Sequence, residues 1–450
     1  MITKQRIQSS EMSDLSTHTA PYSRGFRGLS LEGLAIRGLA LMTILNVNNI
    51  VYQVTGALQV GSTAILILAA LVLASSWRYG RSTPLFLFSA MVASYLLLGW
   101  LYSDQSTDGS EKSYPMAYLA TVIVVWSFTS YLLKVSATTE HAKFLKFLQL
   151  MLLIATASVW LTPVLLPLWN YLPLGEGEQR YAGFFGNPNE AGFVAAYALA
   201  FVLLLPGRSS MLRVALAAFC FFGVVLSFSK TAIVIAVFVL VIGSMTHLRS
   251  RLALILAPLL IGFILVLVSS PAKMFYWVAD QQFVELAPAQ QKRLVEIGNL
   301  MEGQFDDATT TNRTQLWDIG FEQLSKHTPD GAGLGSYHHM EDGVWSVHAD
   351  NWLGIHNTFL MVLGESGVVP AIFFISMLLV VAWRWRMGHG RGLELAIFFV
   401  MLADLMSNHS ALEIRYSNVM LGVLFGLSGR SSRRDDTTVS GNPDAHSRPT

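Results

Sequence analysis

The sequence is short of charged residues. Only 13% of its 450 residues are Asp, Glu, Lys or Arg, whereas about 25% is usual for a soluble domain. Apolar residues make up 53% of the chain. This composition excludes an ordinary soluble protein and predicts an integral membrane protein.

The sequence has a single cysteine and almost no net charge. Cys220 is the only cysteine and lies in an apolar run, which excludes a disulfide framework and a cysteine-based metal site. The net charge of +1 argues against a polyanionic partner such as nucleic acid. We therefore expect neither a cysteine-based metal site nor a nucleic-acid partner, and we expect no cofactor.

Long apolar runs are abundant. A helix needs roughly 20 residues to cross the hydrocarbon core of a bilayer, and lipid offers no partner to an unpaired backbone group. Twelve runs meet this need, with approximate limits 38–55, 59–76, 84–103, 115–133, 147–170, 188–206, 212–227, 231–247, 252–270, 356–383, 392–407 and 411–428. The predicted fold class is an all-α, polytopic membrane protein with about twelve transmembrane helices.

The distribution of Lys and Arg predicts the orientation. With the N-terminus in the cytoplasm, 21 of the 30 basic residues fall in cytoplasmic segments, as the positive-inside rule requires. This orientation places both termini in the cytoplasm and the long loop on the outer face, which in a bacterium with two membranes is the periplasm. The predicted parts are a disordered N-terminus at 1–37, nine helices at 38–270, a periplasmic loop at 271–355, three helices at 356–428 and a disordered tail at 429–450.

Polar clusters gather on the outer side of this topology. The stretch RYAGFFGNPNEAG begins at Arg180, SFSK occupies residues 227–230, and His356 marks the end of the long loop. Their common side predicts one outward-facing site at the membrane boundary. Glu365 lies deeper in the tenth run, where a carboxylate is costly in lipid, so it should face the bundle interior.

The long loop contains an amphipathic pattern. Apolar residues from Arg313 to Leu324 recur with helical spacing, which predicts a helix lying against the membrane surface. Pro329 and the following glycines should end it in a turn. Since no βαβ pattern surrounds the G-x-G-x-G, these glycines do not indicate a phosphate-binding loop.

The motifs in their order resemble the O-antigen ligase family, which also contains O-antigen and exopolysaccharide polymerases. The resemblance rests on R-x-x-G-x-x-x-N-P-N at 180–189, S-x-S-K at 227–230, N-R-x-x-x-W at 312–317, H-x-P-x-G-x-G at 327–333 and H-N-x-x-L-x-x-x-x-E-x-G at 356–367. It covers residues 180–380 well. The preceding helices resemble the family only in topology.

This resemblance implies a membrane glycosyltransferase of type-C architecture. Such an enzyme takes a glycan from undecaprenyl diphosphate and attaches it to a periplasmic acceptor without a metal ion. The resemblance gives functional roles to Arg180, Arg313 and His356. The family usually has arginine where this chain has Lys230, which keeps the charge but not the bidentate fork.

The residue types independently suit these roles. Cleavage at a lipid diphosphate releases an anion, which Arg180 and Arg313 could grip bidentately. His356, with an ordinary pKa of about 6.5, suits a general base that takes the acceptor's proton. The predicted substrate-binding residues are Asn187, Asn189, Glu190, Lys230 and Asn357, and Glu190 is the alternative base.

Each of these residues also has a structural alternative. Arg180 could anchor a helix at the headgroups, and Arg313 could hold the loop helix to lipid phosphate. The asparagines and His356 could cap helix starts, and Lys230 could be structural.

Three functions stay open at this point. The sequence favours a glycan-transferring enzyme, with a slight preference for a polymerase because its G-N-P-N form resembles the exopolysaccharide members. The alternatives are a ligase that joins the glycan to lipid A-core, and a transporter of the lipid-linked glycan. A transporter should have broken or charged helices deep in the membrane, whereas the polar groups here gather at one surface.

Overall fold

The structure is a computed structural model in which most of the chain is described. It describes residues 30–438 except 56–57, 103–113, 166–180, 186, 208, 247–275, 277–279, 281–287, 303–312, 338, 342–343, 346–350, 353–354, 387–391, 409–410 and 414. The described part is helical apart from one small sheet, which agrees with the predicted fold class in its coarse form.

The first half of the chain forms consecutive helices. They are α1 (Leu31–Ile44), α2 (Val47–Thr55), α3 (Leu58–Ser76), η1 (Trp77–Tyr79), α4 (Thr83–Tyr102), α5 (Tyr114–Val135), α6 (Thr139–Leu165), α7 (Pro188–Leu204), α8 (Ser210–Leu226) and α9 (Lys230–Thr246).

The second half combines the long loop with the last helices. It contains α12 (Pro288–Met301), α14 (Arg313–His327), β1 (His339–Glu341), β2 (Val344–Trp345), β3 (Asn351–Trp352), α15 (Thr358–Ser366), α16 (Val368–Arg384), α17 (Gly392–Ser407) and α18 (Arg415–Thr438). The strands form an antiparallel sheet in the order β2-β1-β3, with Met340 opposite Trp345 and Asn351.

Four described helices are long and apolar enough to cross a membrane, namely Val60–Tyr79, Thr83–Tyr102, Met116–Val135 and Thr139–Thr162. Four shorter apolar helices are Pro188–Leu204, Ser210–Leu226, Lys230–Met245 and Val368–Arg384. The count of twelve spans and their orientation stay predictions. The expected span at 252–270 lies outside the described residues.

Two of the predicted spans are broken helices. The run at 38–55 divides at Asn46, whose φ is 50°, and the side chain of Asn46 donates to the carbonyl oxygen of Phe184 at 3.2 Å. The run at 356–383 divides at Gly367, whose φ is 78°. Hydropathy misses both breaks because the apolar composition continues across them.

Helix also extends into both segments predicted as disordered termini. α1 begins at Leu31 and α18 continues to Thr438. The early start of α1 has a physical cause, since Glu32 pairs with Lys134 at 2.6 Å and Arg37 pairs with Glu140 at 3.3 Å. These contacts with other helices order a polar stretch that composition alone marks as loose.

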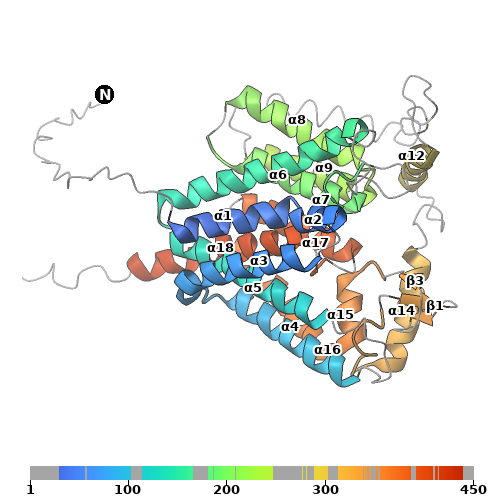
Figure 1. Cartoon of the computed structure of the whole chain (residues 1–450). Helices are drawn as coiled ribbons and strands as arrows, with labels where there is room; N and C mark the ends of the chain where they lie inside the picture. The colour runs from blue at the N-terminus through green and yellow to red at the C-terminus, as the bar shows by residue number, and fades with distance from the viewer. Residues whose placement is uncertain are drawn as a thin grey trace, which may run out of the picture.

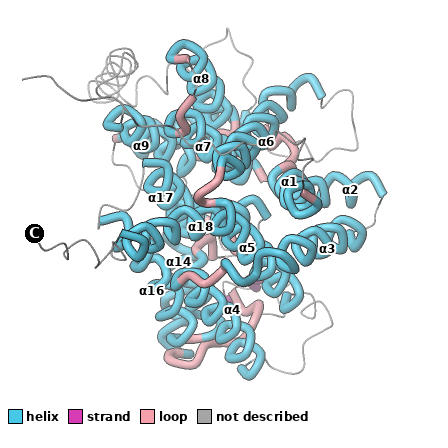
Figure 2. Tube along the Cα trace, turned by 90° about the vertical axis from the view of Figure 1, so that its left-hand side faces the viewer, coloured by secondary structure: helices cyan, strands magenta, loops and turns pink. Residues whose placement is uncertain are grey.

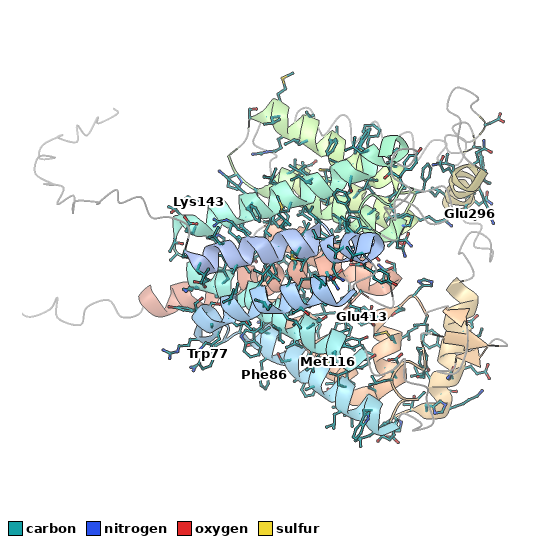
Figure 3. The ribbon with its side chains drawn as sticks, in the orientation of Figure 1. Trp77, Phe86, Met116, Lys143, Glu296 and Glu413 are labelled. Carbon is teal, nitrogen blue, oxygen red and sulfur yellow. The ribbon has the colours of Figure 1, made fainter. Side chains whose placement is uncertain are left out.

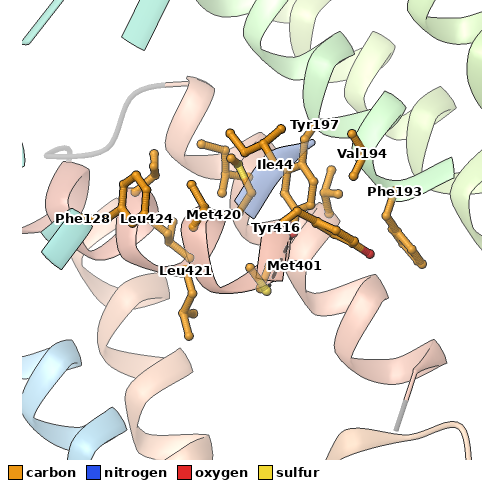
Figure 4. Packing of buried hydrophobic residues seen from close by; sticks show 14 of the residues in the cluster. Ile44, Phe128, Phe193, Val194, Tyr197, Met401, Tyr416, Met420, Leu421 and Leu424 are labelled. Carbon is orange, nitrogen blue, oxygen red and sulfur yellow. Dashed lines mark hydrogen bonds between the residues drawn. The ribbon is translucent and has the colours of Figure 1, made fainter. Parts of the chain in front are cut away.

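Two helices, α7 and α18, form the centre of the bundle. Every residue from Ala191 to Leu203 in α7 is buried, as is every residue of α18 from Tyr416 to Gly429. Figure 2 shows α18 surrounded by other helices. A helix that is apolar on all sides belongs in such a core. Figure 4 shows Tyr197 of α7 meeting Tyr416 and Met401 there.

The two ends of the bundle differ. Figure 1 shows the start of α1 and the end of α18 on one side of the molecule, and α12, α14 and the sheet on the opposite side. We call the side with α12, α14 and the sheet the loop end. The segments that carry the predicted site all begin or end there.

Candidate functional site

The loop before α7 is tied to the end of α6. The N–H of Gly183 donates to Thr162 Oγ1 at 3.1 Å, and the N–H of Phe184 donates to Ser158 Oγ at 3.1 Å. Gly183 has a φ of 59°, and a Cβ there would lie 2.9 Å from the backbone nitrogen of Val159. The glycine of R-x-x-G therefore permits this close approach. Arg180 lies outside the described residues.

α7 begins with a side-chain cap. Asn187 Oδ1 accepts from the N–H of Asn189 at 2.8 Å, and Pro188 occupies the first helical position. This is the expected helix-start arrangement, so the capping alternative for Asn187 is confirmed. Asn189 and Glu190 follow in the first turn and are half-buried, and their substrate role stays a prediction.

The SFSK turn packs directly on α7. Ser227 Oγ donates to the carbonyl oxygen of Val224 at 2.7 Å and accepts from the N–H of Ser229 at 3.3 Å. A Cβ on Gly192 would lie 2.7 Å from Ser227 Oγ and 2.8 Å from the Cβ of Ala232. The glycine of NPNEAG thus lets α7 touch the start of α9.

Lys230 is engaged within the protein. Its Nζ lies 2.8 Å from Glu296 Oε2 of α12, and the two side chains are 18% and 7% exposed. The pair fastens α12 to the start of α9. The charge predicted to bind substrate is therefore paired with a carboxylate, as the structural alternative for Lys230 requires.

The H-x-P-x-G-x-G and E-x-G motifs pack on each other. The N–H of Gly333 donates to the carbonyl oxygen of Glu365 at 3.0 Å, and the N–H of Val368 donates to that of Pro329 at 3.0 Å. Gly331 has a φ of 100°, and a Cβ there would lie 2.6 Å from the carbonyl oxygen of Glu365. These glycines therefore permit close packing of the two backbones.

Glu365 is buried in the bundle, as expected, with 1% of its surface exposed. It accepts a hydrogen bond from the hydroxyl of Tyr95 in α4 and another from the N–H of Tyr337 at 3.2 Å. Tyr118 of α5 lies next to Tyr95, with 3.4 Å between the hydroxyl oxygens. Tyr118 in turn donates to Glu413 Oε1 at 2.9 Å.

Tyr337 links the turn at residues 329–335, which we call the glycine turn, to the H-N motif. Its carbonyl oxygen accepts from the N–H of Ile355 at 3.3 Å, and its hydroxyl donates to the carbonyl oxygen of Gly320 in α14 at 3.4 Å. Burial and the nearby Glu365 carboxylate raise the pKa of Tyr337. Its phenol therefore stays a neutral donor at physiological pH.

His356 occupies a strained position at the entrance to α15. Its φ is 51°, a left-handed conformation that is uncommon outside glycine, and it is half-buried. Asn357 caps α15, since its Oδ1 accepts from the N–H groups of Phe359 at 3.0 Å and Leu360 at 3.1 Å. The cap belongs to Asn357, so His356 is not the inert cap that the structural alternative proposed.

Arg313 is the first residue of α14, the amphipathic helix expected in the long loop. The helix runs to His327, and its Phe321 is exposed on the outer surface. The backbone of Arg313 is described, but its side chain is not, so its predicted role stays untested.

Sequence reasoning missed the turn into α18. There Glu413 accepts from Tyr118, and Arg415 Nη2 donates to Ser62 Oγ at 3.3 Å. The next residue, Tyr416, meets the ring of Phe185 edge-on at 5.9 Å, which brings this turn next to the loop before α7. Two charges flanking Ile414 beside an apolar run were the available signal.

Residues 214–375 match the family model described as O-antigen ligase. This matched region resembles the O-antigen ligase family and covers less than half of the 450 residues. The match supports the O-antigen ligase and polymerase family. No curated protein matches the chain significantly.

The matched region begins inside α8 and includes α9, the long loop, α15 and the first part of α16. Lys230, Arg313, His356 and Asn357 lie inside it, whereas the loop before α7 and the turn into α18 lie outside. The family implies ligase or polymerase-type activity in surface polysaccharide synthesis by a membrane enzyme. Within the described ranges, no group of three or more His, Cys, Asp or Glu side chains could hold a metal ion.

Proposed function

We propose that the protein transfers a glycan from an undecaprenyl-diphosphate donor to an acceptor on the periplasmic face of the inner membrane. The product is surface polysaccharide, and we favour polymerisation over ligation to lipid A-core. The observation that supports this most is the arrangement of the motifs. The loop before α7, the SFSK turn and the H-N motif are far apart in sequence, yet all lie at the loop end.

The proposed reaction divides its tasks among five residues. The acceptor oxygen attacks the anomeric carbon while the bond to the diphosphate oxygen breaks, and that oxygen keeps the electron pair. Arg180 and Arg313 hold the phosphates and offset the developing charge without a metal ion. His356 takes the proton of the acceptor hydroxyl. The amide groups of Asn189 and Asn357 orient sugar hydroxyls.

The orientation is part of this proposal. The excess of Lys and Arg on the side of the termini supports a cytoplasmic position for both ends and a periplasmic loop end. A cysteine replacing Ser346 should react with an impermeant thiol reagent in spheroplasts, whereas one replacing Ser209 should not. The reverse pattern would overturn the orientation.

A reaction with purified components tests the function. The protein in detergent, given an undecaprenyl-diphosphate glycan, should form product without nucleotide and in the presence of a chelator. Product with a second lipid-linked repeat unit identifies a polymerase, and product with lipid A-core identifies a ligase. A lack of product with both acceptors would favour the transporter, which should instead move labelled donor across proteoliposomes.

A further inference from the structure

We propose that Glu413 is a saccharide-binding residue that accepts hydrogen bonds from hydroxyl groups of the acceptor glycan. The inference rests on the proposed function and names a contact that the predicted site lacks. Glu413 lies in the turn between α17 and α18, which sequence analysis did not include in the site.

This turn adjoins the start of α15. Thr358 Oγ1, two residues beyond His356, donates to the carbonyl oxygen of Asn408 at 2.5 Å, just after the end of α17. On the other flank, Thr121 Oγ1 of α5 donates to the carbonyl oxygen of Leu412 at 2.8 Å. The backbone before Glu413 is therefore fixed between the helix that follows His356 and the start of α5.

The same turn adjoins the loop before α7. Tyr416 and Phe185 meet edge-on at 5.9 Å, so the first turn of α18 touches the GFFGNPN stretch. Figure 3 shows Glu413 toward the side of the molecule that carries Glu296, with Lys143 at the opposite end. Glu413 thus lies between the two segments to which we assign donor binding and proton transfer.

The Glu413 carboxylate has capacity left for a ligand. Its side chain is half-buried, and Oε1 accepts a single hydrogen bond, from Tyr118. Within the described part of the chain, Oε2 accepts none, and the carboxylate forms no ion pair. An ionised carboxylate can accept about four hydrogen bonds, and partial burial with only one is costly. Sugar hydroxyls would supply the missing donors.

The position of this carboxylate is fixed from inside the bundle. Tyr118 and Tyr95 each have one hydroxyl hydrogen, and these are directed at Glu413 and Glu365. Their mutual contact of 3.4 Å therefore adds little. The rings of the two tyrosines pack with centroids 4.9 Å apart, so Tyr118 is held against the residue that donates to Glu365 of α15.

The charge of Glu413 selects the ligand class. Burial raises the pKa of Glu413 to about 7, so the side chain is ionised above that pH. In its ionised form it repels phosphate and uronate groups and accepts hydrogen bonds from neutral, hydroxyl-bearing sugars. We therefore place the acceptor sugar, rather than the donor diphosphate, against Glu413.

Binding of a free glycan provides the first test. The probe is the oligosaccharide repeat unit released from the host's surface polysaccharide, titrated calorimetrically into the full-length protein in detergent. Glu413→Gln should weaken binding about tenfold, as expected for a lost charge-assisted hydrogen bond. Tyr118→Phe should weaken it less. Glu394→Gln, a buried glutamate in the first turn of α17, is the control and should bind like the wild type.

Steady-state transfer provides the second test. Glu413→Gln should raise KM for the acceptor while kcat at saturating acceptor stays within about threefold of wild type. Glu413→Asp, which keeps the charge, should lie between the two and replaces the Gln variant if that variant aggregates. Unchanged glycan affinity, or a fall in kcat with KM unchanged, would overturn the proposal.

The two proposals fail separately. If the wild type binds the glycan through Glu413 but transfers nothing to any acceptor, the saccharide-binding role stands and the proposed enzymatic function fails. If the wild type transfers glycan but Glu413→Gln shows normal affinity and KM, the function stands and the role of Glu413 is wrong.

Discussion

The starts of α7 and α15 share the same kind of helix cap but lie in different surroundings. Each helix begins at the loop end with a capping asparagine, whose side chain accepts from one N–H group in α7 and from two in α15. α7 then continues for 17 residues through the centre of the bundle, whereas α15 has 9 residues and ends at Gly367. α7 is therefore a long, fully buried helix, and α15 is a short helix held by the glycine turn.

The backbone strain at these two starts falls on different residue types. Before α7, the left-handed position belongs to Gly183, which adopts it at little cost. Before α15, it belongs to His356 itself. Strain at a non-glycine residue persists only where surrounding contacts impose it, and such residues concentrate at functional sites. The comparison therefore supports the proposed role of His356 in the chemistry at the start of α15.

The largest expected effect tests the α15 side. His356→Ala should lower glycan transfer by about 10²–10⁴-fold, the contribution usual for a general base, while donor affinity stays near normal. His356→Gln should be equally inactive because an amide cannot accept the proton near pH 7. Transfer rates of purified variants measure this. A variant that keeps a tenth of wild-type activity would show that His356 only orients the substrate.

An intermediate effect is expected on the α7 side. Arg180→Lys keeps the charge but loses the paired donors, so donor affinity should fall by roughly 10–100-fold, as when a charge-assisted hydrogen bond is lost. Titration with the lipid-linked donor, at equal protein level in the membrane, measures this. If Arg180→Lys binds donor normally, the arginine is a headgroup anchor and the division between the two sides is wrong.

The smallest effect concerns the caps that both sides share. Asn187→Ala should cost about 1 kcal/mol of stability, and Asn187→Asp should restore most of it because Asp also caps helices. Asn357→Ala should cost a similar amount but reduce transfer more, since it adjoins His356. Thermal unfolding in detergent, followed beside activity, checks both. Equal losses of activity for Asn187→Ala and Asn357→Ala would remove the distinction between the helix starts.

Much of the fold could be predicted from the sequence because composition and run length are local quantities. Apolar runs predicted the helices, and helical periodicity predicted α14. The breaks at Asn46 and Gly367 could not be predicted this way, since each depends on contacts with distant backbone. Asn46 donates to Phe184, and the N–H of Val368, directly after Gly367, donates to Pro329.

Only those parts of the candidate site that lie in recognisable motifs could be predicted from the sequence. The common side of the polar clusters predicted that they would gather, and their segments all reach the loop end. The pairing of Lys230 with Glu296 could not be foreseen, because α12 contains no feature that marks Glu296 as its partner. Glu413 was missed for a similar reason. A single glutamate beside an apolar run does not reveal its contact with Tyr118 or its position next to the neighbouring helices.

The position of α18 has a consequence for how the protein is made. α18 packs against α1, α5 and α17 in the middle of the bundle, yet it follows all the other described helices in the sequence. The earlier helices therefore leave the ribosome with their inner faces unfilled, and the bundle closes only once α18 has been made. A chain that stops before Arg415 would lack the centre of the bundle, so α18 is the element that completes assembly.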